Sequence, residues 1–285
     1  MAVCEVCFRK CRLSEGRIGD CGARIACPGG TRPLYYGQLS ALALDPIEKK
    51  PLARFHPGSR ILSAGSLGCN LHCPFCQNSG ISQRENGGFP ADPGPMSPER
   101  LVETALSLRG RGNIGIAFTY NEPLVGYEYV RDTARLAHEH GLVCVLVTNG
   151  TASLRVLGEI APWIDAMNID LKGFTQRYYR EVLRGDLQMT LDFIREAVRG
   201  CHVELTTLIV PGENDSREEM LELSAWIAGL TGVHGGATGR EIPLHVSRFF
   251  PRYRMMDRGP TPVDTVVSLA EAARQHLQYV YTGNC

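Results

Sequence analysis

Six apolar, β-rich stretches alternate with six amphipathic helical stretches along this chain, and this alternation restricts the fold more than any other feature. The apolar stretches lie at residues 60–66, 114–119, 142–148, 166–171, 202–209 and 242–248. The helical periods lie at residues 98–110, 125–140, 152–160, 187–199, 216–230 and 264–277. Such alternation predicts an α/β fold, a partial (β/α)6 TIM-like barrel with a parallel sheet inside and helices outside. In such barrels the chemistry gathers in the loops at the C-terminal ends of the strands.

The length fits this barrel together with a small N-terminal appendage. With 285 residues the chain can bury one core of that size. Prolines in the segment 45–52 predict an extended connection, so we expect a Cys-rich metal-binding appendage at residues 1–55 and the barrel at residues 56–285. Four prolines and three glycines in the stretch 85–98 predict a lid over the barrel mouth.

Charge and hydropathy exclude several classes of partner. Thirty basic and thirty acidic residues cancel, so no strong field attracts nucleic acid or an anionic membrane. No run of about 18 apolar residues is present, and the first residues lack the basic and then apolar regions of a signal peptide. We therefore expect a cytoplasmic protein with no nucleic-acid or membrane partner. Its eleven cysteines are then metal ligands or free thiols rather than disulfides.

Three cysteines stand in the loop after the first predicted strand, with three and then two residues between them. They are Cys69, Cys73 and Cys76, and the glycine, asparagine, proline and histidine around them indicate a loop. This spacing lets three thiolates bind three irons of one 4Fe–4S cluster, which leaves the fourth iron open to a small chelating ligand. Buried structural thiols are a weaker alternative, because the segment is not apolar. Structural zinc usually takes four ligands in two close pairs, and no second pair follows nearby.

A second group of cysteines opens the chain. Cys4, Cys7, Cys11 and Cys21, followed by Cys27, have the spacing of a metal-binding knuckle, and the first four would make a complete four-thiolate set. Basic residues are interleaved with them, and their positive charge would favour the thiolate form. The spacing does not decide between zinc, which we slightly prefer, and an auxiliary iron–sulfur cluster. Reduced cysteines without any metal are the remaining alternative.

Polar residues mark one face of the fourth predicted strand. Since side chains alternate along a strand, Asn168, Asp170 and Lys172 share one face, while the apolar residues between them face the helices. An acid and a base inside a barrel need a ligand, a cation or each other. These three residues are therefore candidate ligand contacts, with a buried structural ion pair as the alternative.

Other strands carry single candidates. Glu122 follows the second predicted strand, where it can accept a hydrogen bond from an ammonium group. Thr148 closes the third strand beside an Asn-Gly turn, which is weak evidence by itself. On the fifth strand Glu204 shares a face with Thr206 and is as readily structural as functional. His245 lies on the last strand and can face the barrel mouth, although a single histidine is more often a packed core residue.

Taken in order, these motifs resemble those of radical S-adenosylmethionine (SAM) enzymes related to pyruvate formate-lyase activating enzyme, and in particular the AmmeMemoRadiSam-system group. The resembling segments are the N-terminal cysteines and residues 45–52, 68–78, 119–123, 168–172 and 245–251. The resemblance implies that Cys69, Cys73 and Cys76 hold a 4Fe–4S cluster whose open iron is chelated by SAM. It also implies reductive cleavage of SAM to methionine and a 5′-deoxyadenosyl radical, which abstracts hydrogen from a substrate.

The same resemblance assigns roles around SAM. It implies that Glu122 binds the methionine amino group, that Asp170 and Lys172 lie beside the carboxylate with Thr148 in the same neighbourhood, and that Phe75 packs near the adenine. The expected cofactor contacts are Phe75, Glu122, Thr148, Asn168, Asp170, Lys172 and His245. Relatives carry two glycines before the acid, where this chain has Tyr120 and Asn121, so only the acid matches.

Three functions remain open from the sequence. The leading hypothesis is hydrogen abstraction from a protein partner, as activating enzymes do when they install a glycyl radical, with flavodoxin or ferredoxin as the one-electron donor. The second is a radical SAM enzyme that modifies a small molecule or a peptide. The third, of another class, is a non-catalytic iron–sulfur electron carrier, against which the polar strand ends argue. No residue identifies the substrate or a catalytic group.

Overall fold

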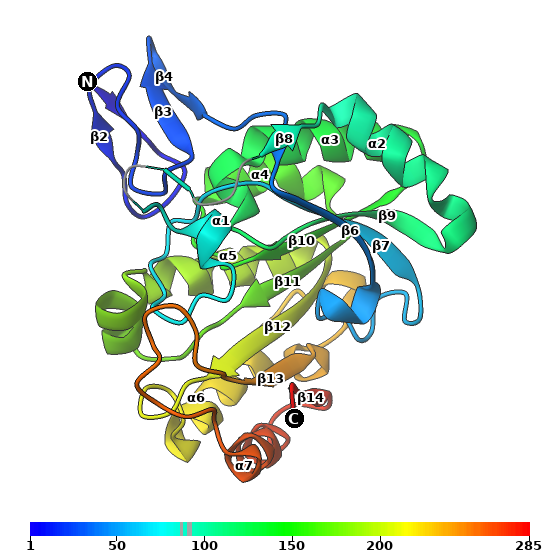
Figure 1. The fold of residues 1–285 in the computed structure, drawn as a ribbon. Helices are drawn as coiled ribbons and strands as arrows, with labels where there is room; N and C mark the ends of the chain where they lie inside the picture. The colour runs from blue at the N-terminus through cyan, green and yellow to red at the C-terminus, as the bar shows by residue number, and fades with distance from the viewer. Residues whose placement is uncertain (86–87, 90–92) are drawn as a thin grey trace.

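The body of the molecule is an eight-stranded sheet. The structure, a computed structural model, describes residues 1–285 except 86–87 and 90–92. The strand order is β14–β13–β12–β11–β10–β9–β7–β6, and every neighbouring pair is parallel except the antiparallel pair of β6 and β7. In Figure 1 the strands wind from β14 near the bottom to β6 and β7 at the right. The strands are β6 (Ala41–Pro46), β7 (Arg60–Gly65), β9 (Asn113–Phe118), β10 (Val143–Thr148), β11 (Ala166–Asp170), β12 (His202–Ile209), β13 (Leu244–Arg248) and β14 (Val280–Gly283).

Helices pack on the outside of the sheet, except the short α1, which lies in front of the strands in Figure 1. They are α1 (Ser79–Ser82), α2 (Pro98–Ser107), α3 (Tyr127–Glu139), α4 (Leu154–Ile160), α5 (Leu187–Gly200), α6 (Arg217–Ala228) and α7 (Val263–Ala273). In α3 the residues Val130, Ala134 and Ala137 recur at helical spacing and are buried, which is the apolar stripe that holds a helix on a sheet. Side chains at the N-caps of α2, α4, α5 and α6 accept backbone hydrogen bonds and fix where these helices begin.

The predicted α/β architecture is confirmed, and the sheet has two strands more than the six predicted. Strand β14 adds a further parallel strand beside β13. Strand β6 pairs antiparallel with β7 along its whole length, from Ala41 opposite Gly65 to Pro46 opposite Arg60. Because β6 lies within the first 55 residues, part of that range belongs to the main sheet. The division into an appendage of residues 1–55 and a barrel of residues 56–285 stays a prediction.

Residues 45–54, which we call the floor segment, close the end of the barrel at which the parallel strands begin. Ile47 and Leu52 are fully buried and pack in one cluster with Ile61, Ala117 and Val145 on the strands. The first two residues of the segment end strand β6, and a short 3-10 helix, Ile47–Lys49, follows directly. The prediction of an extended connection is therefore wrong for this segment, because burial of its two aliphatic side chains folds it back under the sheet.

Short strands make up the N-terminal part of the chain. Two antiparallel pairs, β1 (Ala2–Val3) with β2 (Arg12–Leu13) and β3 (Arg24–Cys27) with β4 (Gly30–Pro33), stand at the upper left of Figure 1. A third pair joins β5 (Gln38–Leu39) to β8 (Gly94–Pro95).

This N-terminal part is tied to the barrel by buried contacts. Arg24 is 2% exposed and forms an ion pair of 2.7 Å with Glu128 on α3. The amide of Ser153 donates to the carbonyl of Val6 at 2.8 Å, directly before α4. These contacts fix the N-terminal cysteines against the loops at the C-terminal ends of the strands.

Two sequence predictions concern segments outside the core. The predicted lid at residues 85–98 includes residues 86–87 and 90–92, which lie outside the described residues. Within the described part of the chain, no helix has both the length and the apolar character needed to cross a membrane.

Candidate active site

The three cysteines of the predicted cluster loop line one cavity of about 350 Å³ at the C-terminal ends of the strands. The loop begins at Gly68, whose φ is +94°, and a Cβ there would lie 2.6 Å from the Cys21 carbonyl oxygen. Only glycine fits both this conformation and this close approach. The amide of Cys69 then donates to the same carbonyl at 3.3 Å, and the amide of Cys76 donates to the carbonyl of Cys73 at 3.2 Å.

The thiols of Cys69, Cys73 and Cys76 fit a 4Fe–4S cluster. Burial raises the pKa of all three, to about 12 at Cys73, and mutual repulsion between thiolates raises those of Cys69 and Cys73 further. Iron would favour the thiolates that burial alone disfavours. Among the described residues, no three histidine, cysteine or acidic side chains are placed to hold a single metal ion. In a 4Fe–4S cluster each thiolate binds a different iron, so three thiols that are too far apart to share one ion are compatible with a cluster.

Glu122 lies on the wall of the same cavity as a buried carboxyl group. Oε1 accepts from the Thr148 hydroxyl at 2.7 Å and from the Leu124 amide at 3.0 Å, and Oε2 accepts from the Asn149 amide at 2.8 Å. Burial raises the pKa of Glu122 to about 7, although these three hydrogen bonds lower it. The hydrogen bonds thus hold the carboxyl group rigidly, and burial brings its pKa close to neutrality. Both features are typical of a buried carboxyl group at a binding site.

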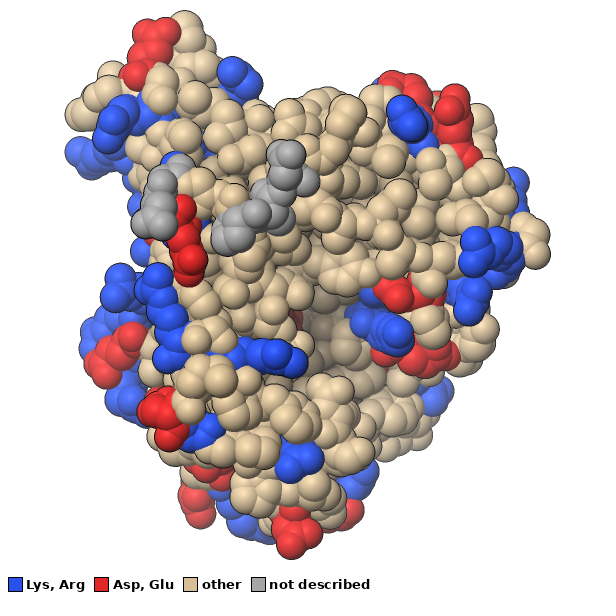
Figure 2. Space-filling model, in the orientation of Figure 1, with Lys and Arg blue, Asp and Glu red and all other residues tan. Residues whose placement is uncertain are grey.

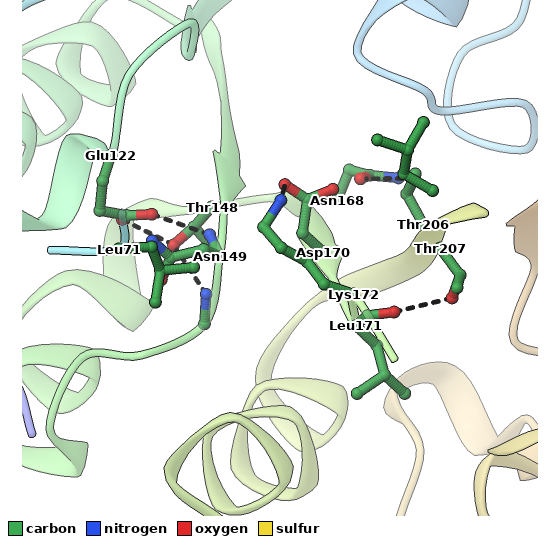
Figure 3. Close-up of polar contacts among 12 residues, drawn as sticks. Leu71, Glu122, Thr148, Asn149, Asn168, Asp170, Leu171, Lys172, Thr206 and Thr207 are labelled. Carbon is green, nitrogen blue, oxygen red and sulfur yellow. Dashed lines mark hydrogen bonds and ion pairs between the residues drawn. The ribbon is translucent and has the colours of Figure 1, made fainter. Parts of the chain in front are cut away.

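Asp170 and Lys172 form an ion pair on the cavity wall. Lys172 Nζ lies 2.8 Å from Asp170 Oδ2, and both side chains are partly exposed to the cavity. Burial lowers the pKa of Lys172, but the Asp170 charge outweighs burial and raises it, so the ammonium stays charged. In Figure 3 this pair lies between Glu122 with Thr148 and Asn149 on one side and Asn168 with Thr206 on the other.

Phe75 also lines the cavity. It is buried, and its ring packs edge-on against Phe249 with the centroids 6.2 Å apart. Of the predicted contacts, the structure therefore brings together Phe75, Glu122, Thr148, Asp170 and Lys172 around the three thiols. Figure 2 shows this face of the molecule hollowed at its centre.

Asn168 and His245 do not line this cavity. The Asn168 side-chain amide donates to the Pro51 carbonyl at 2.8 Å, and its oxygen accepts from Thr206. His245 Nε2 lies 2.6 Å from Glu204 Oε2, and its ring stacks on Tyr281. Both residues point inward as predicted, but one layer below the cavity wall. We therefore leave both out of the proposed SAM site.

Glu204 belongs to this lower layer as well. Its carboxylate accepts from the amides of Ala53 and Arg54 at 2.9 and 2.7 Å and from His202 at 3.0 Å. Burial alone would raise its pKa, but these bonds together with the one from His245 lower it to about 2. Glu204 is therefore an anchor for the floor segment, in agreement with the structural alternative for this residue.

The N-terminal cysteines lie directly against the cluster loop. Cys4, Cys7 and Cys21 are buried and Cys11 is half-buried. Burial raises the pKa of Cys7 to about 11 and that of Cys21 to about 12, and repulsion from the neighbouring thiolates adds to both shifts. No three of these side chains are placed to hold one ion within the described residues. A second metal site here stays a prediction.

Several cavity residues were missed by sequence reasoning. Asn149, interpreted as part of a turn, donates from its side chain to Cys69 Sγ at 3.6 Å and to Asn70 Oδ1 at 2.9 Å. Lys49 and Lys50 of the floor segment also line the cavity. Both lysines lie in the segment 45–52 that carries part of the family resemblance, but a pair of cations between two prolines indicates a solvated turn and no ligand contact.

Comparison with known proteins agrees with this site. The sequence profile of the Radical SAM superfamily matches residues 65–224. An uncharacterized protein of Methanocaldococcus jannaschii is 39% identical, over 99% of this chain and 80% of its own length. Pyruvate formate-lyase 1-activating enzyme of Escherichia coli is 23% identical, over 62% of this chain and 72% of the enzyme.

Among solved structures, Streptococcus suis SuiB bound to S-adenosylmethionine superposes with a TM-score of 0.59 at 14% identity. The superposition covers 77% of this chain and 49% of SuiB, so the chain spans about half the length of that protein. At this identity the likeness shows a shared fold.

Proposed function

Because this chain belongs to the radical SAM superfamily, we propose that it cleaves SAM reductively and abstracts a hydrogen atom from a substrate, with a protein as the leading candidate substrate. The observation that carries the proposal is the arrangement of three thiols, one buried acid and one ion pair around a single cavity. Family membership implies a 4Fe–4S cluster and SAM. The cluster, when bound, supplies the electron that splits SAM into methionine and the 5′-deoxyadenosyl radical.

The residues of this chain would bind and orient SAM. Cys69, Cys73 and Cys76 would hold the cluster, and with no fourth cysteine in this cavity one iron would stay open for SAM. Glu122, fixed by three hydrogen bonds, would accept a hydrogen bond from the methionine amino group. Lys172, which stays charged beside Asp170, would attract the SAM carboxylate.

The proposed substrate class follows from one of the relatives and from the size of the cavity. The similarity to an enzyme whose name states that it activates pyruvate formate-lyase supports a protein substrate. Because the cleavage of SAM is reductive, we expect a one-electron donor such as flavodoxin or ferredoxin. Modification of a small molecule or a peptide is the second candidate, favoured by the cavity volume of about 350 Å³. Membership of the AmmeMemoRadiSam-system group and the binding of zinc or a second cluster by Cys4, Cys7, Cys11 and Cys21 are further parts of this proposal.

The test is anaerobic reconstitution with iron and sulfide, followed by dithionite and SAM, with 5′-deoxyadenosine as the readout. Wild-type protein is expected to form 5′-deoxyadenosine, and Cys73→Ala is expected to abolish it because only two cluster thiolates remain. Cys144→Ala is the matched control, since Cys144 is buried on β10 and does not line the cavity. Product from the Cys73 variant would refute the cluster assignment.

Metal counting in the same samples separates the other possibilities. About four irons with one zinc per chain would support a zinc knuckle, and about eight irons would support a second cluster. A reduced cluster that binds no SAM would support the electron-carrier function instead. SAM binding without cleavage, which begins only when a partner protein is added, would support the activating role.

A further inference from the structure

The cavity has two chemically different ends. The end at the cluster loop carries the thiols, Glu122 and the Asp170–Lys172 pair. A second part of the lining, which we call the second end, is formed by Lys49 and Lys50 of the floor segment and by Tyr120. None of the roles proposed for SAM uses this second end.

Lys50 is held in place at this end. It is only 2% exposed, and its Nζ lies 2.8 Å from Asp45 Oδ2 and 5.0 Å from the centre of the Tyr120 ring. The Tyr120 hydroxyl donates to the same Asp45 oxygen at 2.8 Å. Burial alone would raise the pKa of Asp45, but Lys50 and Tyr120 lower it to about 2, so Asp45 is a permanent anion.

The backbone at Tyr120 is arranged to direct this side chain. Its φ is +73°, in the left-handed region that residues with a Cβ rarely adopt. The ring lies against Gly65, where an added Cβ would come within 2.9 Å of it. Strain of this kind persists where the surroundings enforce it, often at ligand sites. Here the strained backbone directs the Tyr120 side chain toward the floor segment. The side chain of Glu122, two residues further along, faces Thr148.

The wall at this end carries an excess of positive charge. Lys49 and Lys50 line the cavity, whereas Asp45 lies behind them and is not part of its wall. Asp45 is shared, since Lys49 Nζ lies 4.0 Å from its other carboxylate oxygen. Two cations against one anion leave a net charge of +1, and the Asp170 carboxylate on the wall is paired with Lys172. This positive charge of the floor segment would attract an anionic group that enters the cavity.

We propose that Lys50, backed by Asp45 and Tyr120 and assisted by Lys49, binds a carboxylate or phosphate group of the substrate and so fixes the substrate opposite SAM. This proposal rests on the proposed function, since it assigns the substrate end of the same cavity. It predicts that substrates with an anionic group bind more tightly than neutral analogues, because only an anion is attracted by the excess positive charge of the two lysines.

The experiment measures anion binding to the reconstituted, SAM-bound protein by isothermal titration calorimetry. One titration uses inorganic phosphate and the other uses succinate, so the comparison shows whether the site prefers a phosphate or a carboxylate group. Lys50→Met is expected to weaken binding of the preferred anion at least tenfold. Arg111→Met, which removes an exposed cation from the turn after α2, is the control and should bind as wild type does.

Lys50→Met leaves Asp45 without its close partner and can disturb folding. The double variant Asp45→Asn with Lys50→Met removes both charges and should show the same loss of anion binding with retained SAM binding. Equal anion affinity in wild type and double variant, or no binding of either anion by wild type, would overturn the proposal. The 5′-deoxyadenosine assay on the same samples separates the two ideas. Product without anion binding overturns the anion site at Lys50 alone. Anion binding by protein that neither binds SAM nor forms product overturns the radical function alone.

Discussion

Replacement of Glu204 by glutamine tests whether the floor segment is held by a charged anchor. The Glu204 carboxylate is fully buried and receives the amides of Ala53 and Arg54 from the floor segment and the rings of His202 and His245 from the sheet. Glutamine keeps the shape but replaces one acceptor oxygen by an NH2 group, which faces donors. At least one buried N–H group is then left without a partner.

The pKa of Glu204 sets the size of the effect. A decrease from 4.5 in the unfolded chain to about 2 in the folded protein corresponds to about 3 kcal/mol of stability at neutral pH. Because the pKa is lower in the folded protein than in the unfolded chain, the full contribution to stability is present at pH values above the unfolded-state pKa. It is lost as the pH falls toward 2. Between about pH 7 and about pH 3 the contribution should shrink by about 2 kcal/mol.

Urea unfolding followed by circular dichroism measures both quantities. Glu204→Gln is expected to lower the unfolding free energy by about 3 kcal/mol at neutral pH, and its difference from wild type should narrow by about 2 kcal/mol near pH 3. Glu103→Gln, at an exposed position on α2, should change stability by less than about 0.5 kcal/mol. A Glu204 variant as stable as the Glu103 variant, or a difference that does not depend on pH, would refute this reasoning.

Three further changes test the SAM end of the cavity and the N-terminal cysteines. Glu122→Gln should weaken SAM binding. In calorimetry the SAM affinity of wild type should rise as the pH increases through about 7, because the buried carboxyl group loses its proton there. The affinity of the variant should not depend on pH in this range. Asp170→Asn should weaken SAM binding severalfold, because Lys172 loses the partner that orients it; unchanged affinity, equal to that of the exposed control Asp192→Asn, would return the pair to a structural role. Cys7→Ala should remove metal from the N-terminal site and leave about four irons at the core cluster; full retention of all metal would show that Cys7 is not a ligand.

Local patterns predicted the strands and helices because each strand and each helix repeats its own apolar period. They also predicted that Asn168 and Asp170 share an inner face. They could not predict that Asn168 sits one layer lower, since a two-residue period gives the face of a strand but not the height of a residue in the barrel. That height follows from the pairing of neighbouring strands, which sets Asn168 opposite Glu204 and Asp170 opposite Thr206.

The floor segment was misinterpreted for a related reason. Its prolines describe the local backbone, but the burial of Ile47 and Leu52 depends on strands far along the chain. The role of Tyr120 was equally hidden, because a positive φ at a tyrosine has no signature in the sequence. Long-range packing, rather than local preference, thus decides what the floor segment presents to the cavity.

Tyr120 and Glu122 stand on one short turn between β9 and α3, and Asn121 between them fixes that turn by bonding Gly68 and Ser66 at the start of the cluster loop. A ligand that moved the backbone at Tyr120 would also act on Glu122, two residues further along the same turn. Thermodynamic linkage then requires reciprocity: whatever factor a bound substrate applies to SAM affinity, SAM applies to substrate affinity. The factor by which each molecule changes the affinity of the other would consequently depend on this turn.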